Sequence, residues 1–275
     1  MRAAGMTSGF ASRQDSDHFR QASPTPALEA EPGSLAARLG ERLSGIHPLF
    51  VFLGGIVLSY VVLTLATVGV GVVFTETVLS VGGVEEADSD AIEWLADQRT
   101  PTLNDLSFFG SEVSGGIVLP ILVCLLAIAF AIRRHWRAAA FALFSVALES
   151  ATYRTTVLFV DRERPDVPRL DDLPPDASFP SGHVAASIAV YGGLALLLTS
   201  RMASGLPRTL VWAVAVAIPL IVGISRMYRG MHHPLDTLAG VLVGIAALAS
   251  VVFVERVTGA VARRRGQVKL AGGPA

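Results

Sequence analysis

The chain has 275 residues, of which 52% are hydrophobic and 16% charged, with a formal net charge of −1 at pH 7. Soluble domains carry about 25% charged residues, so this composition excludes a soluble globular enzyme and a disordered chain. The near-neutral charge does not indicate a nucleic-acid partner, and a single cysteine excludes an internal disulfide. The composition instead predicts an all-α membrane protein.

The first 47 residues differ in composition from the rest of the chain. Residues 1–33 are rich in Ser, Ala, Pro and charged residues without a period, which predicts a disordered tail. In residues 34–46 the apolar side chains recur on one helical face, which predicts either a short helix at the membrane interface or a solvated linker. We assign residues 1–47 to a cytoplasmic tail.

Six apolar runs follow, and they predict six transmembrane helices. A membrane-spanning helix needs about 20 apolar residues, and the first run contains no charged residue at all. We assign residues 48–256 to one six-span domain and residues 257–275 to a basic cytoplasmic tail. The predicted spans are 49–74, 113–132, 138–160, 184–199, 209–225 and 238–254.

The distribution of arginine and lysine predicts the orientation of these spans. With six spans, the tail before the first, the loops after the second and fourth, and the C-terminal segment all lie on one side, and all are basic. The loop 75–112 on the other side is strongly acidic. We therefore expect both termini to be cytoplasmic and the loops 75–112, 161–183 and 226–237 to face outward, in a bacterial cell membrane.

Two of the outward loops carry basic residues and histidines on the side that should lack them. These residues fall in three segments, Asp161–Pro165, Phe179–His183 and Ser225–Asp236. An anionic ligand is the simplest reason for basic residues there. The segments resemble the motifs of the type 2 phosphatidic acid phosphatase superfamily, K-x6-R-P, P-S-G-H and S-R-x5-H-x3-D. The second and third motifs match in full.

The residues of these motifs suit phosphoryl transfer, and the resemblance implies the same roles. We expect His232 to attack phosphorus as a neutral imidazole and form a phosphohistidine. Asp236, four residues on, is expected to accept the ring N–H of His232. His183 is expected to protonate the leaving oxygen and then activate water. His233 is expected to be structural, because both motif spacings select His232.

Phosphate binding is predicted for a second group of residues. Planar guanidinium groups suit phosphate oxygens, and a serine hydroxyl and close backbone add further donors. We expect no metal and no cofactor, because the motifs hold a single acid and no carboxylate cluster for magnesium. The predicted phosphate-binding residues are Arg164, Ser181, Gly182 and Arg226.

The first motif departs from the family pattern, because Val157 stands where the lysine belongs. Lys269 is the only lysine of the chain, so no other lysine can substitute. Arg154 lies three residues earlier on a similar helical face and could extend outward. Arg162 is the other candidate for this phosphate contact.

The sequence thus predicts a metal-independent phosphatase of membrane lipids, with its active site on the extracytoplasmic side. Expected substrates are phosphatidate, phosphatidylglycerol phosphate or a polyprenyl diphosphate, and no obligatory protein partner is indicated. Two alternatives stay open: a lipid phosphotransferase that uses the same histidine, and a non-catalytic lipid-binding or transport protein. Soluble vanadium haloperoxidases share the motifs, but six spans argue against them.

Overall fold

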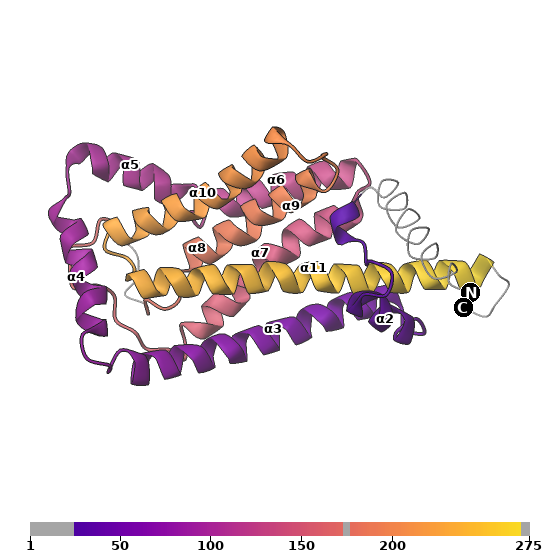
Figure 1. Ribbon diagram of the computed structural model, residues 1–275, viewed down its shortest axis with the longest axis horizontal. Coiled ribbons are helices and arrows are strands. Elements are labelled where there is room, and N and C mark those ends of the chain that lie inside the picture. The colour runs from indigo at the N-terminus through magenta and orange to yellow at the C-terminus, as the bar shows by residue number, and fades with distance from the viewer. Residues whose placement is uncertain (1–24, 173–176, 271–275) are drawn as a thin grey trace, which may run out of the picture.

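The computed structural model describes residues 25–172 and 177–270, and helices are the only regular elements of these ranges. The long helices run side by side as a bundle (Figure 1). The predicted all-α class is therefore confirmed. The bundle contains α3 (Pro48–Val73) with its π-helical extension η2 (Phe74–Val78), α6 (Val118–Ile132), α7 (Trp136–Thr156), the continuous α8–η3–α9 (Gly182–Ser187, Ile188–Gly192, Gly193–Thr199), α10 (Leu206–Tyr228) and α11 (Pro234–Leu270).

Four helical segments of the described chain are long and apolar enough to cross a membrane: Pro48–Val78, Gly182–Thr199, Leu206–Tyr228 and Pro234–Val268. Helix α6 is apolar but has only 15 residues, about 22 Å at 1.5 Å per residue, against a hydrocarbon core of about 30 Å. Helix α7 carries Glu149 and Arg154 within its 21 residues. The chain is an integral membrane protein, and six crossings remain a prediction.

Two further helices lie at one end of the bundle, within the acidic segment 75–112 that joins the first two predicted spans. Helix α4 (Val84–Asp97) runs across that end, and α5 (Pro101–Glu112) returns alongside α10 (Figure 1). Pro101 and the side chain of Thr100, which accepts a hydrogen bond from the Leu103 backbone N–H at 3.2 Å, fix the start of α5. A Cβ on Gly110 would lie 2.3 Å from the Ser225 hydroxyl, so glycine allows α5 and α10 to approach closely.

The N-terminal segment corrects the prediction of a tail, as far as it is described. Residues 1–24 lie outside the described ranges, but Leu28 is fully buried against α7 and α11, and Glu29 forms an ion pair with Arg137 at 2.6 Å. Helix α2 (Leu35–Arg42) forms where a helix or a linker was expected, and it packs against α11 through Ala36 and Val257. Residues 25–42 therefore belong to the packed bundle, because their apolar side chains are buried against α7 and α11.

The helix that contains the predicted sixth span is longer than that span. Helix α11 continues without a break to Leu270, and Val257 and Val261 are buried on it. Their burial against the N-terminal segment extends the core beyond the predicted sixth span. The basic residues Arg263, Arg264 and Arg265 of the predicted tail are therefore helical.

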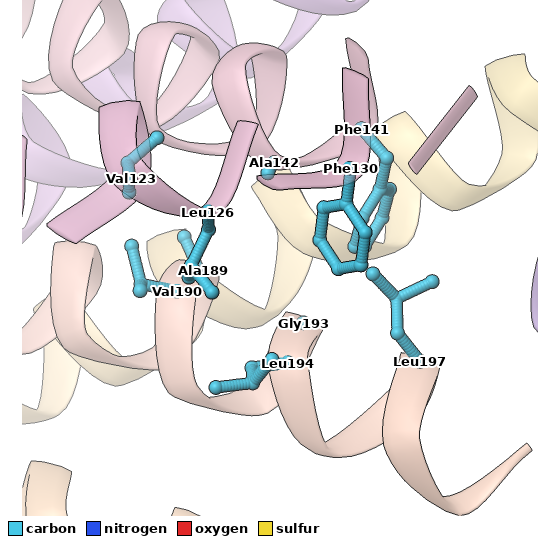
Figure 2. Close-up of a pocket in the computed structure, with 10 residues that line it drawn as sticks. All are labelled: Val123, Leu126, Phe130, Phe141, Ala142, Ala189, Val190, Gly193, Leu194 and Leu197. Atoms are coloured by element: carbon cyan, nitrogen blue, oxygen red, sulfur yellow. The ribbon is translucent and has the colours of Figure 1, made fainter. Parts of the chain in front are cut away.

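Figure 2 shows a small apolar cavity inside the bundle. Its volume is about 20 Å³, and α6, α7 and the η3–α9 segment line it with side chains such as Val123, Phe141 and Leu197. It contains none of the predicted site residues. An apolar space of this size is a packing void of the core rather than a ligand site.

The predicted motifs gather at the end of the bundle that α4 covers, and the described terminal segments lie toward the other end (Figure 1). The motif residues come from the loop that follows α7, from the start of α8, from the end of α10, and from the turn and first residues of α11 that follow it. Segments far apart in sequence meet there, such as Arg162 and Asp236, which are 74 residues apart.

Candidate active site

His232 lies in the short turn that joins α10 to α11. Gly230 ends α10 with a φ of +72°, a conformation that glycine adopts without strain, and Pro234 begins α11. The turn buries the imidazole, which is 2% exposed. Its Nδ1 lies 2.8 Å from the carbonyl oxygen of Ser178. A carbonyl can only accept, so Nδ1 carries the proton and the lone pair is on Nε2.

The surroundings of His232 keep it neutral. Burial lowers the pKa of His232 well below its usual value, and the positive charges of Arg226 and Arg164 lower it further, against the opposing charge of Asp236. An unprotonated Nε2 is the form of imidazole that can attack phosphorus. The geometry therefore suits the predicted nucleophile.

Asp236 is completely buried at the start of α11, but it does not contact the ring of His232 as predicted. One carboxylate oxygen accepts from Arg162, and the other accepts from the Ser178 hydroxyl and from the His233 backbone N–H at 2.9 Å. Four residues on one helix would bring Asp236 beside His232, but His232 lies in the turn before α11 begins. Asp236 therefore acts through Ser178, whose carbonyl holds the imidazole.

His233, in contrast, turns its ring toward Asp236, with Nδ1 and the carboxylate oxygen 3.3 Å apart. The ring is buried between the turn and α11, and the backbone N–H of the same residue donates to the same oxygen. Both contacts fix the turn rather than reach the space around His232. They suit the structural role predicted for His233.

His183, Ser181 and Gly182 form the start of α8. The Ser181 backbone N–H donates to the carbonyl of Asp236 at 3.0 Å, which fixes α8 against α11. The Ser181 hydroxyl is fully buried and has no hydrogen-bond partner among the described residues. The ring of His183 lies within electrostatic range of Arg226, Asp171 and Arg164. His183 and His232 are therefore both within electrostatic range of Arg226 and Arg164.

Gly182 allows a close contact between α8 and α7. A Cβ at this position would lie 3.0 Å from two ring carbons of Tyr153 on α7. The glycine therefore lets the start of α8 pack directly against an aromatic ring. We expected it to allow close approach of the backbone to phosphate, and the contact that the structure provides is with Tyr153.

Arg226 presents a guanidinium that is only partly used by the protein. Its Nη1 donates to the Ser111 hydroxyl at 3.0 Å and to the Asp171 carboxylate at 2.6 Å. Its Nε is buried and meets no acceptor within residues 25–172 and 177–270. A buried donor without an acceptor is costly, so this edge of the arginine is suited to an anionic ligand.

The segment Asp161–Pro165 contributes two arginines, and they make different contacts. Arg164 is buried and donates from Nη1 to the carbonyl of Met231 at 2.6 Å, directly before His232. Arg162 pairs with both Asp88 of α4 and Asp236, and it lies 5.0 Å from the ring centre of Phe74. Its charge is therefore engaged in holding Asp236, and a contact of Arg162 with phosphate stays a prediction.

The remaining candidate to replace the motif lysine is Arg154, and its contact with phosphate also stays a prediction. Arg154 is exposed on α7 and is not brought into the buried group that surrounds His232. Val157 ends that helix without supplying any charge. In the described chain, Arg164 and Arg226 are the arginines whose positive charges act on both His232 and His183.

Residues 138–257 match the PAP2 superfamily. A decaprenylphosphoryl-5-phosphoribose phosphatase from Mycobacterium tuberculosis is 34% identical over 150 residues, which cover 52% of this chain and 73% of that protein. The chain belongs to the PAP2 superfamily. The resemblance found in the motifs is thus confirmed.

Other PAP2 relatives agree with this assignment. Phosphatidylglycerophosphatase B of Bacillus subtilis is 27% identical over 165 residues, or 59% of this chain and 80% of that protein. An undecaprenyl-diphosphatase of Sulfolobus acidocaldarius is 41% identical over 75 residues, which span only 32% of its length and 27% of this chain. The names of these relatives confirm the predicted enzyme class, a phosphatase among the hydrolases.

A solved structure shares the PAP2 fold. The crystal structure of a PAP2-type phosphatidylglycerolphosphate phosphatase from Bacillus subtilis superposes with a TM-score of 0.57 at 24% identity. The superposition covers 74% of this chain and 93% of that protein. The likeness shows that the helical arrangement is common to both chains.

Four residues of this PAP2 site were missed in the sequence. Asp88, Asp171, Ser178 and Arg229 all bond directly to the motif residues or to one another. Arg229 is 5% exposed. An available signal was its basic charge on the outward side, which needs the same explanation as the charge of Arg226. Asp88 lies on α4 and Asp171 in the loop after α7, and the sequence gives no indication of the partners of either acid.

No three side chains of His, Cys, Asp or Glu gather closely enough to hold a metal ion within the described ranges of this PAP2 chain. The oxygens of Asp236 are taken by Arg162, Ser178 and His233. The donor set around the two histidines is instead rich in N–H groups, which bind anions rather than cations.

Proposed function

We propose that this protein removes a terminal phosphate from a membrane lipid through a phosphohistidine on His232, without a metal ion. The observation that carries the proposal is a pair of buried, unpartnered donors beside a neutral imidazole. The Nε of Arg226 and the hydroxyl of Ser181 find no acceptor in the described chain. A phosphate group would supply acceptor oxygens to both donors while its phosphorus faces His232.

The reaction would proceed in two balanced steps. In the first, Nε2 of His232 forms a bond to phosphorus as the bond to the leaving oxygen breaks, and His183 gives that oxygen its proton. In the second, His183 takes a proton from water, the resulting hydroxide attacks phosphorus, and the bond to Nε2 breaks. Inorganic phosphate leaves, and both histidines return to their starting protonation states.

The positive groups would stabilise the charge on the three equatorial oxygens. Phosphoryl transfer depends mostly on positioning and electrostatic stabilisation. Arg164 and Arg226 both act electrostatically on His232 and His183, so both lie near the reacting atoms. Ser178 would stabilise the imidazole indirectly, because its carbonyl accepts from Nδ1 while its hydroxyl donates to Asp236.

An apolar groove supports a lipid as the substrate. It lies between the η3 region, α10 and α11, has a volume of about 400 Å³, and is lined at one end by Met227 and Thr237, the neighbours of Arg226 and Asp236. It extends to Trp212, fifteen residues from Met227 along α10, or about 22 Å at the rise of an α-helix. A hydrocarbon tail would fit there with its phosphate at the catalytic end.

The side of the membrane that the site faces is part of the proposal. The opposite end of the bundle carries Arg133, Arg134 and Arg201 in its loops and Arg208 at the start of α10. By the positive-inside rule this end is cytoplasmic, and the site is extracytoplasmic. A site on that side suits a lipid phosphate that is released outside the cell and whose phosphate must be removed there.

The experiment is a substrate panel with the purified full-length protein in detergent, with inorganic phosphate as the readout. Phosphatidate, phosphatidylglycerol phosphate and a polyprenyl diphosphate are compared, with and without EDTA. We expect phosphate release from at least one lipid, unaffected by EDTA and abolished in His232→Ala and His183→Ala. His47→Ala, at the far end of the bundle, is the control.

Three outcomes would overturn the proposal. Transfer of the phosphoryl group to an acceptor other than water, with no free phosphate, would indicate a phosphotransferase. Lipid binding without turnover, unchanged in His232→Ala, would indicate a lipid-binding or transport protein. Loss of activity in EDTA that magnesium restores would show that the reaction needs a metal ion.

A further inference from the structure

A chain of charged groups lies behind the phosphate-binding arginine. Asp171, in the loop after α7, accepts hydrogen bonds from two arginines at the end of α10, Arg226 and Arg229. Neither Asp171 nor Arg229 belongs to the motifs of the superfamily quoted above. Both side chains are largely removed from solvent, at 17% and 6% exposure.

Arg229 is held at every N–H group that it has. Its Nε donates to Asp171 at 2.8 Å, Nη1 donates to the Asn104 carbonyl and the Ser107 hydroxyl at 3.2 Å each, and Nη2 donates to the Leu170 carbonyl at 2.8 Å and to Asp171. These bonds use all five donors of the guanidinium. Arg229 has no donor left for a ligand, so it serves as an anchor between α5, α10 and the loop of Asp171.

Arg226 is divided into a bound edge and a free edge. Its Nη1 uses both of its N–H groups on Ser111 and Asp171. On the opposite edge, which Nε and Nη2 form, the buried Nε makes no hydrogen bond within the described chain. Two parallel N–H groups on one edge are the arrangement that binds phosphate oxygens in a bidentate manner.

We propose that Asp171, anchored by Arg229, is a positioning residue that fixes Arg226 with its Nε–Nη2 edge toward the reacting phosphate. This inference rests on the proposed function, because it assigns Arg226 to the phosphate. A long arginine side chain has many rotamers, and fixing one of them before the substrate arrives reduces the entropy that binding must overcome. Arg226, Arg229 and Asp171 together carry a net charge of +1, so the group remains positive toward a phosphate.

The electrostatics of Asp171 agree with a permanent bridge. Burial on its own would raise the pKa of Asp171, but the hydrogen bond from Arg229 and the charges of Arg226, Arg229 and His183 hold the pKa below its usual value. The carboxylate therefore stays ionised throughout the neutral pH range. Its contacts with both arginines are charge-assisted at any pH at which the protein would work.

The variant that tests the inference is Asp171→Asn, with Asp172→Asn as a matched control. The control makes the same change of charge at the next residue, which is exposed. Two quantities are measured on the full chain in detergent: kcat and KM for the best lipid phosphate, and the affinity for orthovanadate by titration calorimetry. We expect kcat/KM and vanadate affinity to fall about 10- to 100-fold in Asp171→Asn and less than twofold in Asp172→Asn.

Two more variants separate positioning from general destabilisation. Arg229→Gln should reproduce the loss of vanadate affinity, and it should add less than twofold in the Asp171→Asn background, because both act through Arg226. Ser111→Ala, a small change at the other partner of Nη1, should reduce vanadate affinity about threefold. Thermal unfolding of each variant confirms that the folded protein is being compared.

The results that overturn the inference differ from those that overturn the proposed function. Unchanged or tighter vanadate binding in Asp171→Asn would mean that Asp171 is unnecessary or competes with phosphate, and so would additive effects in the double variant. In both cases the wild-type protein would still hydrolyse lipid phosphates. If the wild-type protein neither releases phosphate nor binds vanadate, the proposed function itself fails.

Discussion

Replacing Asp236 by asparagine separates two accounts of how His232 is held. In the arrangement expected from the motif spacing, Asp236 would accept the ring N–H of His232 and determine its tautomer. In the structure, the ring N–H goes to the Ser178 carbonyl at 2.8 Å, and Asp236 holds Ser178, Arg162 and the His233 backbone. The change Asp236→Asn therefore leaves the bond that fixes the tautomer in place.

The two accounts predict different magnitudes. Loss of a carboxylate that directly holds a catalytic imidazole lowers kcat about 10⁴-fold in a catalytic triad. Here we expect a loss of about 10- to 100-fold, or about 1.4 to 2.7 kcal/mol in activation free energy, because only the support of Ser178 is weakened. The larger effect should be on folding, since Arg162 and Asp236 are buried and losing one charge of such a pair costs about 3–5 kcal/mol.

The assay combines kcat at saturating lipid phosphate with denaturant or thermal unfolding of the same preparations. Asp88→Asn is the matched comparison, because Asp88 pairs with the same arginine but not with Ser178. We expect Asp88→Asn to reduce stability with a smaller effect on kcat. A loss of about 10⁴-fold in kcat for Asp236→Asn, with normal stability, would refute the indirect role and restore the direct contact with His232.

Three other changes have outcomes that follow from the same geometry. His232→Ala should abolish phosphate release, whereas His233→Ala should retain activity within about tenfold, because its ring makes only a 3.3 Å contact with Asp236; equal losses would contradict this. Arg154→Gln should change kcat/KM less than twofold, and a large fall in kcat/KM would place Arg154 in the site. Arg162→Gln should lower the free energy of unfolding by about 3–5 kcal/mol, and unchanged stability would contradict this. The pKa of His232 is lower in the folded protein than in the unfolded chain. Below about pH 6.5 the unfolded chain therefore binds a proton at this imidazole that the folded protein does not bind. The free energy of unfolding should fall by up to about 1.4 kcal/mol per pH unit as the pH drops. Unfolding curves of wild type and His232→Gln between pH 8 and 5 measure this, and an equal loss in both would refute it.

The sequence predicts best those elements that depend on a local pattern of residues. Uncharged apolar runs predict helices α3 and α11 without knowledge of the fold, and the motif spacing selects His232, His183 and Arg226 for one site. Those spacings identify residues because they are fixed by chain connectivity. They do not determine which atoms touch, and the contact predicted between His232 and Asp236 is absent for that reason.

The elements that sequence could not supply depend on contacts between distant segments. Leu28 and Glu29 looked like part of a tail, and only the surfaces of α7 and α11 make their burial favourable. Asp171 and Arg229 are separated by 58 residues and meet because α10 ends beside the loop after α7. Helix periodicity carries no information about such a pair.

Direct detection of the covalent intermediate tests the central claim. The purified protein is mixed with a lipid whose terminal phosphate is ³²P-labelled, denatured at alkaline pH within milliseconds, digested and mapped by mass spectrometry. The account predicts label on the imidazole of His232, in the peptide that follows Arg229, and none in His232→Ala. Rapid release of labelled phosphate with no label on His232 at any time, or label that persists in His232→Ala, would contradict it.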